Sequence, residues 1–123
     1  MTTILHHSLS KQVIGMAFSV HNILGSGLLE SAYEGAMVIE LQQAGIPFER
    51  QRTYPLYYKG ELVGAYIADL VVNDSIILEL KSVKALNRIM EAQLINYLSL
   101  SGIRVGYLIN FNSIRLEYKR FVV

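Results

Sequence analysis

Two carboxylates and one ammonium group lie in the most hydrophobic part of the sequence, the stretch DLVVNDSIILELK from Asp69 to Lys81. An unpaired charge costs several kcal/mol to bury, so these side chains need either a partner or a chemical role. Residues two apart in a strand point to the same face, and Glu79 therefore shares a face with Lys81. Facing carboxylates suit a cation such as Mg²⁺ or Mn²⁺. Such an ion binds a phosphate oxygen and lowers the pKa of an attacking water.

The length of the turn between the two apolar runs decides whether Asp69 can join this pair. A two-residue loop sets Asp69 opposite Leu78, on the wrong face, whereas a three-residue loop at 73–75 sets it opposite Glu79. We predict the three-residue loop, or an equivalent bulge, so that both carboxylates converge with Lys81. The other reading of the same charges is a structural ion pair between Lys81 and one carboxylate that closes a sheet edge.

The rest of the chain alternates between helical and strand patterns. Apolar residues at helical spacing predict helices over residues 9–24, 28–44 and 87–100. Tyr, Val and Ile are enriched in the segments that we predict to be strands, which are residues 48–58, 61–72, 75–83, 104–111 and 114–123. The order α-α-β-β-β-α-β-β predicts a single α/β domain over residues 1–123, with a mixed central β-sheet flanked by α-helices.

The composition is that of a compact globular protein. The 123 residues are 52% hydrophobic and 17% charged, which argues against disorder, and the net charge of +1 excludes nucleic-acid binding through bulk charge alone. The chain has no cysteine, which excludes disulfides and thiolate chemistry. Its N-terminal segment lacks the features of a secretory signal, and no apolar run approaches the ~18 residues of a membrane span. The expectation is a cytoplasmic protein whose C-terminal third, from Lys81 onward, is locally basic.

The spacing of the three charged residues is similar to a known signature. Asp69, nine intervening residues and then Glu79-Leu80-Lys81 on an apolar strand resemble the motif of the PD-(D/E)XK nuclease superfamily. Ala68 stands where that motif often has proline, a position that varies. The resemblance implies a restriction-endonuclease-like core, the PD-(D/E)XK fold, and a nuclease that hydrolyses phosphodiester bonds with the help of a divalent metal.

A second motif points to a branch of that superfamily. The segment GLLESAY, from Gly27 to Tyr33, resembles the motif that names the GxxExxY protein family. Further segments resemble that family in the same order along the chain, namely NILGSGLLESAYE, ILELKSVKAL, EAQLINYLSLSGIRVGYLINF and RLEYKRFV. The resemblance therefore covers nearly the whole chain.

The resemblance implies roles for the residues at these positions. Asp69 and Glu79 are expected to ligate Mg²⁺ or Mn²⁺ together with the backbone carbonyl of Leu80, and Lys81 is expected to assist the attacking water. Glu30 is implied as a further ligand from an N-terminal helix. The other reading of Glu30 is a helix-capping one: at about the third helical position, its carboxylate can reach back to an exposed N–H and oppose the helix dipole.

The third predicted helix carries the element QLINY. Gln93 and Tyr97 are four residues apart and project from the same helix face. They resemble the QxxxY element of RecB-type and lambda-exonuclease-type nucleases, which implies that they line the active site. The alternative is that Tyr97 is a core aromatic residue and Gln93 caps a neighbouring backbone group.

The remaining expectations concern binding. Tyr33, one turn after Glu30, together with Lys84 and Arg88, is expected to contact substrate phosphates. The implied partner is nucleic acid, DNA rather than RNA, with no membrane, and a small apolar domain of this kind is expected to form a homo-oligomer such as a dimer. The alternative function is a catalytically inactive nuclease-like module that binds nucleic acid or a protein partner.

Overall fold

The computed structural model describes residues 4–123, and these form three helices and five strands. The elements are, in chain order, α1 (His7–Leu24), α2 (Glu30–Gln43), β1 (Phe48–Tyr58), β2 (Glu61–Val72), β3 (Ile76–Lys81), α3 (Arg88–Ser101), β4 (Val105–Asn110) and β5 (Glu117–Val122). The strands make one sheet in the order β1-β2-β3-β4-β5, parallel between β3 and β4 and antiparallel elsewhere. The predicted element order and the predicted mixed α/β sheet are therefore confirmed.

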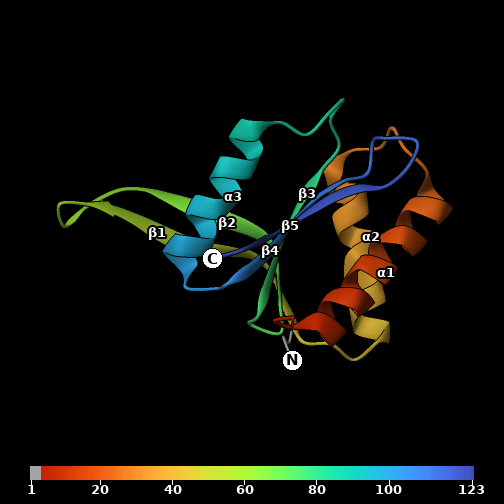
Figure 1. The fold of residues 1–123 in the computed structure, drawn as a ribbon, viewed down its shortest axis with the longest axis horizontal. Coiled ribbons are helices and arrows are strands. Elements are labelled where there is room, and N and C mark those ends of the chain that lie inside the picture. The colour runs from red at the N-terminus through yellow and green to blue at the C-terminus, as the bar shows by residue number, and fades with distance from the viewer. Residues whose placement is uncertain (1–3) are drawn as a thin grey trace.

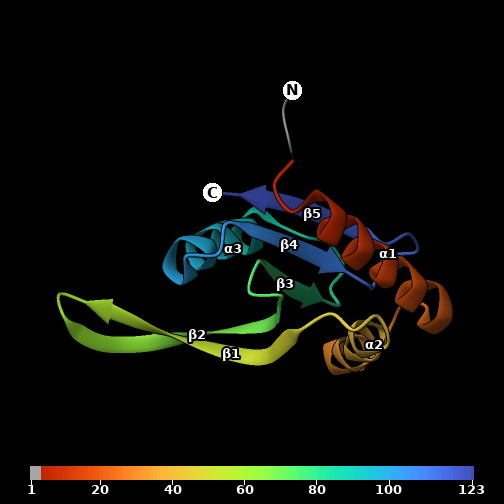
Figure 2. The ribbon, with the colours of Figure 1, turned by 90° about the horizontal axis from the view of Figure 1, so that it is seen from below.

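Helices cover both faces of the sheet (Figures 1 and 2). On one face α1 and α2 bury a core that includes Val13, Met37 and Leu78, and on the other face α3 buries Leu94 and Leu98 against the sheet. No helix among residues 4–123 combines the length and the apolar character that a membrane crossing requires. Both faces matter for the site, because successive side chains of the central strand β3 point to opposite faces of the sheet.

The turn between β2 and β3 has the predicted length. Val72 pairs with Ile76, which leaves a three-residue loop at 73–75. Asn73 and Asp74 adopt left-handed backbone conformations with φ of 51° and 53°, which Asn and Asp tolerate better than most residues. Leu70 pairs with Leu78, so this register brings Asp69 and Glu79 to the next position along the two strands, as the parity argument requires.

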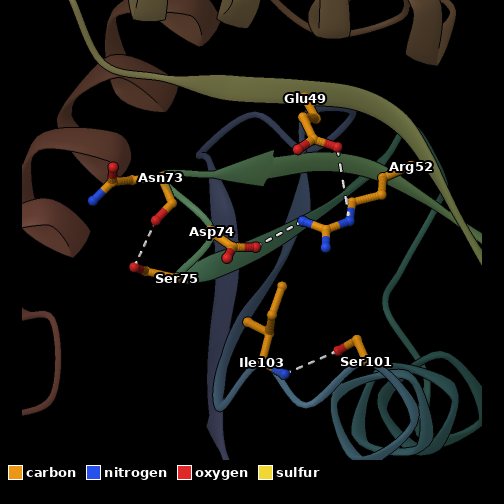
Figure 3. Close-up of polar contacts among 7 residues, drawn as sticks. All are labelled: Glu49, Arg52, Asn73, Asp74, Ser75, Ser101 and Ile103. Atoms are coloured by element: carbon orange, nitrogen blue, oxygen red, sulfur yellow. Dashed lines mark hydrogen bonds and ion pairs between the residues drawn. The ribbon is translucent and has the colours of Figure 1, made fainter.

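Side chains around this turn hold it against β1, as Figure 3 shows. The Ser75 hydroxyl donates to the Asn73 carbonyl at 2.8 Å, and Arg52 on β1 forms an ion pair with Asp74 at 2.7 Å. Glu49 approaches the same guanidinium at 3.7 Å. The turn is thus tied to the neighbouring strand as well as closed on itself.

Only the end of β2 belongs to the central sheet. β2 pairs with β3 from Leu70 to Val72 alone, whereas it pairs with β1 along nearly its whole length. Residues 52–68 therefore leave the sheet as a two-stranded ribbon, which we call the β1–β2 arm, and it projects to the left in Figure 1. The gap between this arm and β3 begins at Asp69.

The side chains of β2 change face at the same point. Tyr66 and Ala68 pack toward α3, whereas Leu70 packs with α1 and α2, although a regular strand would keep residues of even number on one face. Arg50 pairs with Leu70 and Arg52 with Ala68, but Gln51 and Asp69 between them do not pair, and Gln51 has a φ of 51°. This left-handed residue in β1 breaks the regular pleat, and Asp69 lies at the break.

Candidate active site

Asp69 points into the gap between β2 and β3. Its Oδ2 accepts a hydrogen bond of 2.8 Å from the backbone N–H of Leu80, in place of the backbone carbonyl that a paired strand would offer. Both backbone groups of a strand residue are directed to the same neighbouring strand. The Leu80 carbonyl is therefore directed toward the Asp69 side, where β2 has left the sheet.

Glu79 and Lys81 line one cavity on the α3 side of β3. This cavity has a volume of about 290 Å³ and lies between the arm, β3 and α3. Glu79 is only 7% exposed, and its Oε1 accepts a hydrogen bond from the Tyr66 hydroxyl. The shared face that the strand period predicts for Glu79 and Lys81 is confirmed.

Asp69 lines a second, smaller cavity of about 170 Å³, together with Glu30 and Leu80. Asp69 therefore does not line the cavity that Glu79 and Lys81 share, although the charges of Asp69 and Lys81 both act on Glu79. The loop length was predicted correctly, but the break in the pleat at Asp69 turns this side chain into the gap between the strands. The two carboxylates lie on either side of the Leu80 backbone.

The charge of Asp69 nevertheless acts on Glu79. Burial raises the pKa of Glu79 and the charge of Asp69 raises it further, to about 7, although the Tyr66 hydroxyl and Lys81 lower it. Burial also raises the pKa of Asp69, against the hydrogen bond from Leu80 N–H. Glu34 and Glu30 add to this rise, and Lys81 opposes it. The site therefore carries more negative charge than its own lysine neutralises.

These groups fit a divalent cation by their chemistry. Mg²⁺ takes oxygen ligands and is usually held by one or two carboxylates, with water and substrate phosphate completing its shell. Asp69 and Glu79 both offer carboxylate oxygens, and a cation held by them would offset the effect of the Asp69 charge on Glu79. Among residues 4–123 no three His, Cys, Asp or Glu side chains form a group that could hold a metal ion, so a Glu30 ligand stays a prediction.

Lys81 is not occupied by a structural ion pair. The ion pairs among the described residues lie elsewhere, at Arg50–Glu34, Arg52–Glu49, Arg52–Asp74 and Lys119–Glu91. The alternative reading of the sequence, in which Lys81 pairs with a carboxylate to close a sheet edge, therefore does not describe this structure. The Lys81 ammonium remains free to act in the cavity that it lines.

Glu30 is brought to the site by the loop that precedes α2. It is the first residue of α2, not about the third as predicted, and no side chain caps this helix end. The Ser82 hydroxyl, just after β3, donates to the Leu28 carbonyl at 2.6 Å, and the Gly27 N–H donates to the Asn112 side chain at 3.1 Å. These bonds fix the start of α2 beside the end of β3.

Gln93 and Tyr97 both line the larger cavity from α3, as the helix period predicts. Tyr97 is half-buried, and its ring stacks on Tyr66 with the centroids 3.5 Å apart and an interplanar angle of 11°. Asn87 begins this helix by accepting a hydrogen bond from the Met90 N–H at 2.9 Å. Tyr97 is thus both a packed aromatic residue and part of the cavity wall, so both interpretations that the sequence left open for this residue apply.

Tyr33 is fully buried and lines neither cavity, which corrects the prediction that it contacts substrate phosphates. Its ring stacks on Phe111 with the centroids 4.5 Å apart. Its hydroxyl donates to the Gly25 carbonyl at 2.7 Å and accepts from the Leu28 N–H at 3.2 Å. The tyrosine of the GLLESAY segment therefore holds the loop between α1 and α2, because the start of α2 turns this residue inward.

This role predicts an effect on stability. Tyr33→Phe keeps the buried ring but removes both hydrogen bonds, and we expect the free energy of unfolding to fall by about 1–2 kcal/mol. Urea denaturation measures the change, with Tyr58→Phe at the exposed tip of the arm as the control that should leave stability unchanged. A stable Tyr33→Phe variant with weakened nucleic-acid binding would instead restore the substrate-contact role.

The other predicted phosphate contacts are not brought into the site. Lys84 and Arg88 are exposed and line neither cavity, so their contact with substrate stays a prediction. Sequence reasoning missed Tyr66, since a regular strand would put a residue three positions before Asp69 on the other face. It also missed Asn110, a fully buried side chain at the end of β4 that bonds both backbone groups of Val83.

Comparison with known proteins agrees with this geometry. Residues 7–121 match the family described as the PD-(D/E)XK nuclease superfamily. The crystal structure of SSO0001 is similar with a TM-score of 0.58 and 21% sequence identity, over 95% of this chain and 59% of that one. An alkaline exonuclease from Laribacter hongkongensis (LHK-Exo) aligns with a TM-score of 0.43 and 12% identity, over 99% of this chain and 72% of that one. No curated protein matches the sequence.

The SSO0001 similarity shows the fold alone, and this chain spans 59% of the length of that protein. The family match extends over nearly the whole chain and includes the helices and strands that carry the two cavities. By that match, the chain belongs to the PD-(D/E)XK nuclease superfamily.

Proposed function

We propose that this chain is a divalent-metal-dependent nuclease that hydrolyses phosphodiester bonds of DNA, and that it belongs to the GxxExxY branch of the superfamily. The observation that supports the proposal most is the placement of Asp69, whose carboxylate is held by the Leu80 N–H between the buried Glu79 and Lys81 of the same strand. Burial, and then the charge of Asp69, raises the pKa of Glu79 to about 7, although Lys81 lowers it. A site built in this way favours a doubly charged cation.

Asp69, Glu79 and the Leu80 carbonyl would hold Mg²⁺ or Mn²⁺ at the point where β2 and β3 separate. When bound, such an ion supplies charge for the phosphate oxygens and a more acidic water. The Leu80 N–H fixes the Asp69 carboxylate, and the Tyr66 hydroxyl fixes that of Glu79. Each carboxylate therefore meets the ion already oriented.

Lys81 would orient the attacking water or neutralise charge that develops on the phosphate. Its ammonium shares the larger cavity with Gln93 and Tyr97, which would bound the substrate on the α3 side. Glu30 approaches from the start of α2, on the side of the smaller cavity. The residues expected to act on the phosphate thus come from β3 and from the two helices α2 and α3.

The test is cleavage by the purified protein and by two variants. The wild-type chain with Mg²⁺ or Mn²⁺ is expected to cut DNA, and Lys81→Ala is expected to abolish cutting while it keeps the thermal shift that Mn²⁺ causes. Asp69→Asn is expected to lose both, because it removes a metal ligand. Gel assays on single- and double-stranded DNA, with RNA in parallel, measure cleavage, and scanning fluorimetry measures the shift.

The outcomes separate the candidate functions. A Mn²⁺-induced shift that depends on Asp69, without cleavage of any nucleic acid, would support a binding module that has kept its cation. Cleavage of RNA alone would change the substrate but keep the mechanism. Neither a shift nor cleavage by the wild-type chain would leave the proposal without support and favour the inactive nuclease-like module.

A further inference from the structure

Tyr66 lies at the centre of a stack of three tyrosines drawn from three elements. Its ring lies 5.9 Å from that of Tyr54 on β1 and 3.5 Å from that of Tyr97 on α3, with interplanar angles of 15° and 11°. The side chain is only 4% exposed. Because both faces of the ring are covered, its hydroxyl is held at one position relative to β3.

That position is next to the Glu79 carboxylate. The Tyr66 hydroxyl donates a hydrogen bond to Glu79 Oε1. A phenol hydroxyl carries its proton at neutral pH and an ionised carboxylate can only accept, so Tyr66 is the donor of this bond. A carboxylate has two oxygens, and this bond leaves Oε2 for another partner.

We propose that Tyr66 is a positioning residue that orients Glu79 for a divalent cation, and that Tyr97 supports the site through its stacking on Tyr66. The inference rests on the proposed metal-dependent function. A purely structural role would assign the support of the metal site to the packed tyrosine rings. The proposal assigns it to one group, the Tyr66 hydroxyl. The β1–β2 arm thereby contributes Tyr66 to the site, although residues of the arm do not pair with β3.

The stack contains a matched control. The hydroxyl of Tyr54 is also buried, but within the described residues it has no hydrogen-bond partner. Tyr66→Phe and Tyr54→Phe therefore each remove one buried hydroxyl from the same stack and keep the ring. Only the first of these hydroxyls contacts Glu79.

The experiment is a titration of each protein with Mn²⁺ by calorimetry, without nucleic acid. Removing a group that orients a metal ligand typically weakens metal affinity by about 10- to 100-fold, and we expect a rise of that size in the Kd of Tyr66→Phe. Tyr54→Phe should keep the wild-type Kd to within about twofold. Circular dichroism checks that both variants are folded, and high Mn²⁺ concentration should restore cleavage by Tyr66→Phe, which it cannot do for a misfolded variant.

The possible failures are distinguishable. If the wild-type chain binds no Mn²⁺, the proposed function falls and this inference with it. If the wild-type chain binds Mn²⁺ and Tyr66→Phe binds it equally well, the inference is overturned while the proposed function stands. An equal loss of affinity in both variants would assign the effect to the stack as a whole, and would also overturn the role of the Tyr66 hydroxyl.

Discussion

Glu79→Gln is expected to abolish metal-dependent cleavage and, at pH 8 without metal, to make the protein more stable than the wild type. The amide has the same shape as the carboxylate and can still accept the hydrogen bond from Tyr66, but it carries no charge for a cation. It also removes the repulsion between Glu79 and Asp69. The same substitution should therefore remove the activity and also raise the free energy of unfolding, because no buried negative charge remains at position 79.

The stability effect depends on pH in a defined direction. The pKa of Glu79 is raised by burial and by Asp69 from 4.5 to about 7. As the pH rises through this window, the unfolded chain loses the proton before the folded chain does, so the wild-type protein loses stability. A shift of this size corresponds to about 3 kcal/mol. The stability that the protonated Glu79 carboxyl group contributes is thus fully present below about pH 4.5 and lost above about pH 7.

Denaturation by urea at several pH values, with a chelator present, measures this effect. The curves of the wild type and Glu79→Gln should coincide near pH 4.5 and separate toward pH 8, and Mn²⁺ should raise the stability of the wild type alone. Glu61→Gln, an exposed change near the tip of the arm, is the control for the loss of one charge. A Glu79→Gln variant that is no more stable than the wild type at pH 8 would contradict the electrostatic account of the site.

Asn110→Ala is expected to lower the free energy of unfolding by about 2–4 kcal/mol, because it removes the partners of several buried polar groups. The Asn110 side chain accepts from the Val83 N–H at 3.1 Å and from the Asn112 N–H at 3.2 Å. It donates to the Val83 carbonyl at 3.0 Å and to Glu117 at 3.3 Å. Alanine can replace none of these bonds.

Thermal and urea denaturation test this prediction. Asn96→Ala, an exposed change on α3, should alter stability by no more than about 0.5 kcal/mol and serves as the control. Because Ser82 bonds Leu28 next to this network, Asn110→Ala is also expected to reduce cleavage by loosening the start of α2. A fully stable Asn110→Ala protein would mean that water replaces the lost partners.

Features that depend on a few neighbouring residues were predictable. The helix over Arg88–Ser101 is bounded by Asn87, which caps it, and by Gly102, whose φ is 76°. The strand period placed Glu79 and Lys81 in one cavity, and the helix period placed Gln93 there too. Each of these arguments needs only the geometry of one element, which is why the sequence was sufficient.

Features that depend on how elements meet were not predictable. Tyr33 lies in α2 as predicted, but the direction of its side chain depends on two contacts outside that helix. Its ring stacks on Phe111, which is far away in the sequence, and its hydroxyl bonds the irregular loop at Gly25. In the same way, Asn110 looks like one more polar residue at a strand end. Its importance follows from the chain segment at Val83 that happens to pass beside it.

The sequence by itself determined the order of the elements and the charged residues that share one face of β3, because backbone periodicity decides both. Only the tertiary structure decided where Asp69 points. The left-handed conformation of Gln51 and the departure of the arm break the pleat there, so the carboxylate meets Leu80 and not the larger cavity. The same break turns Tyr66 toward Glu79, because the pairing of strands overrides the alternation within one strand.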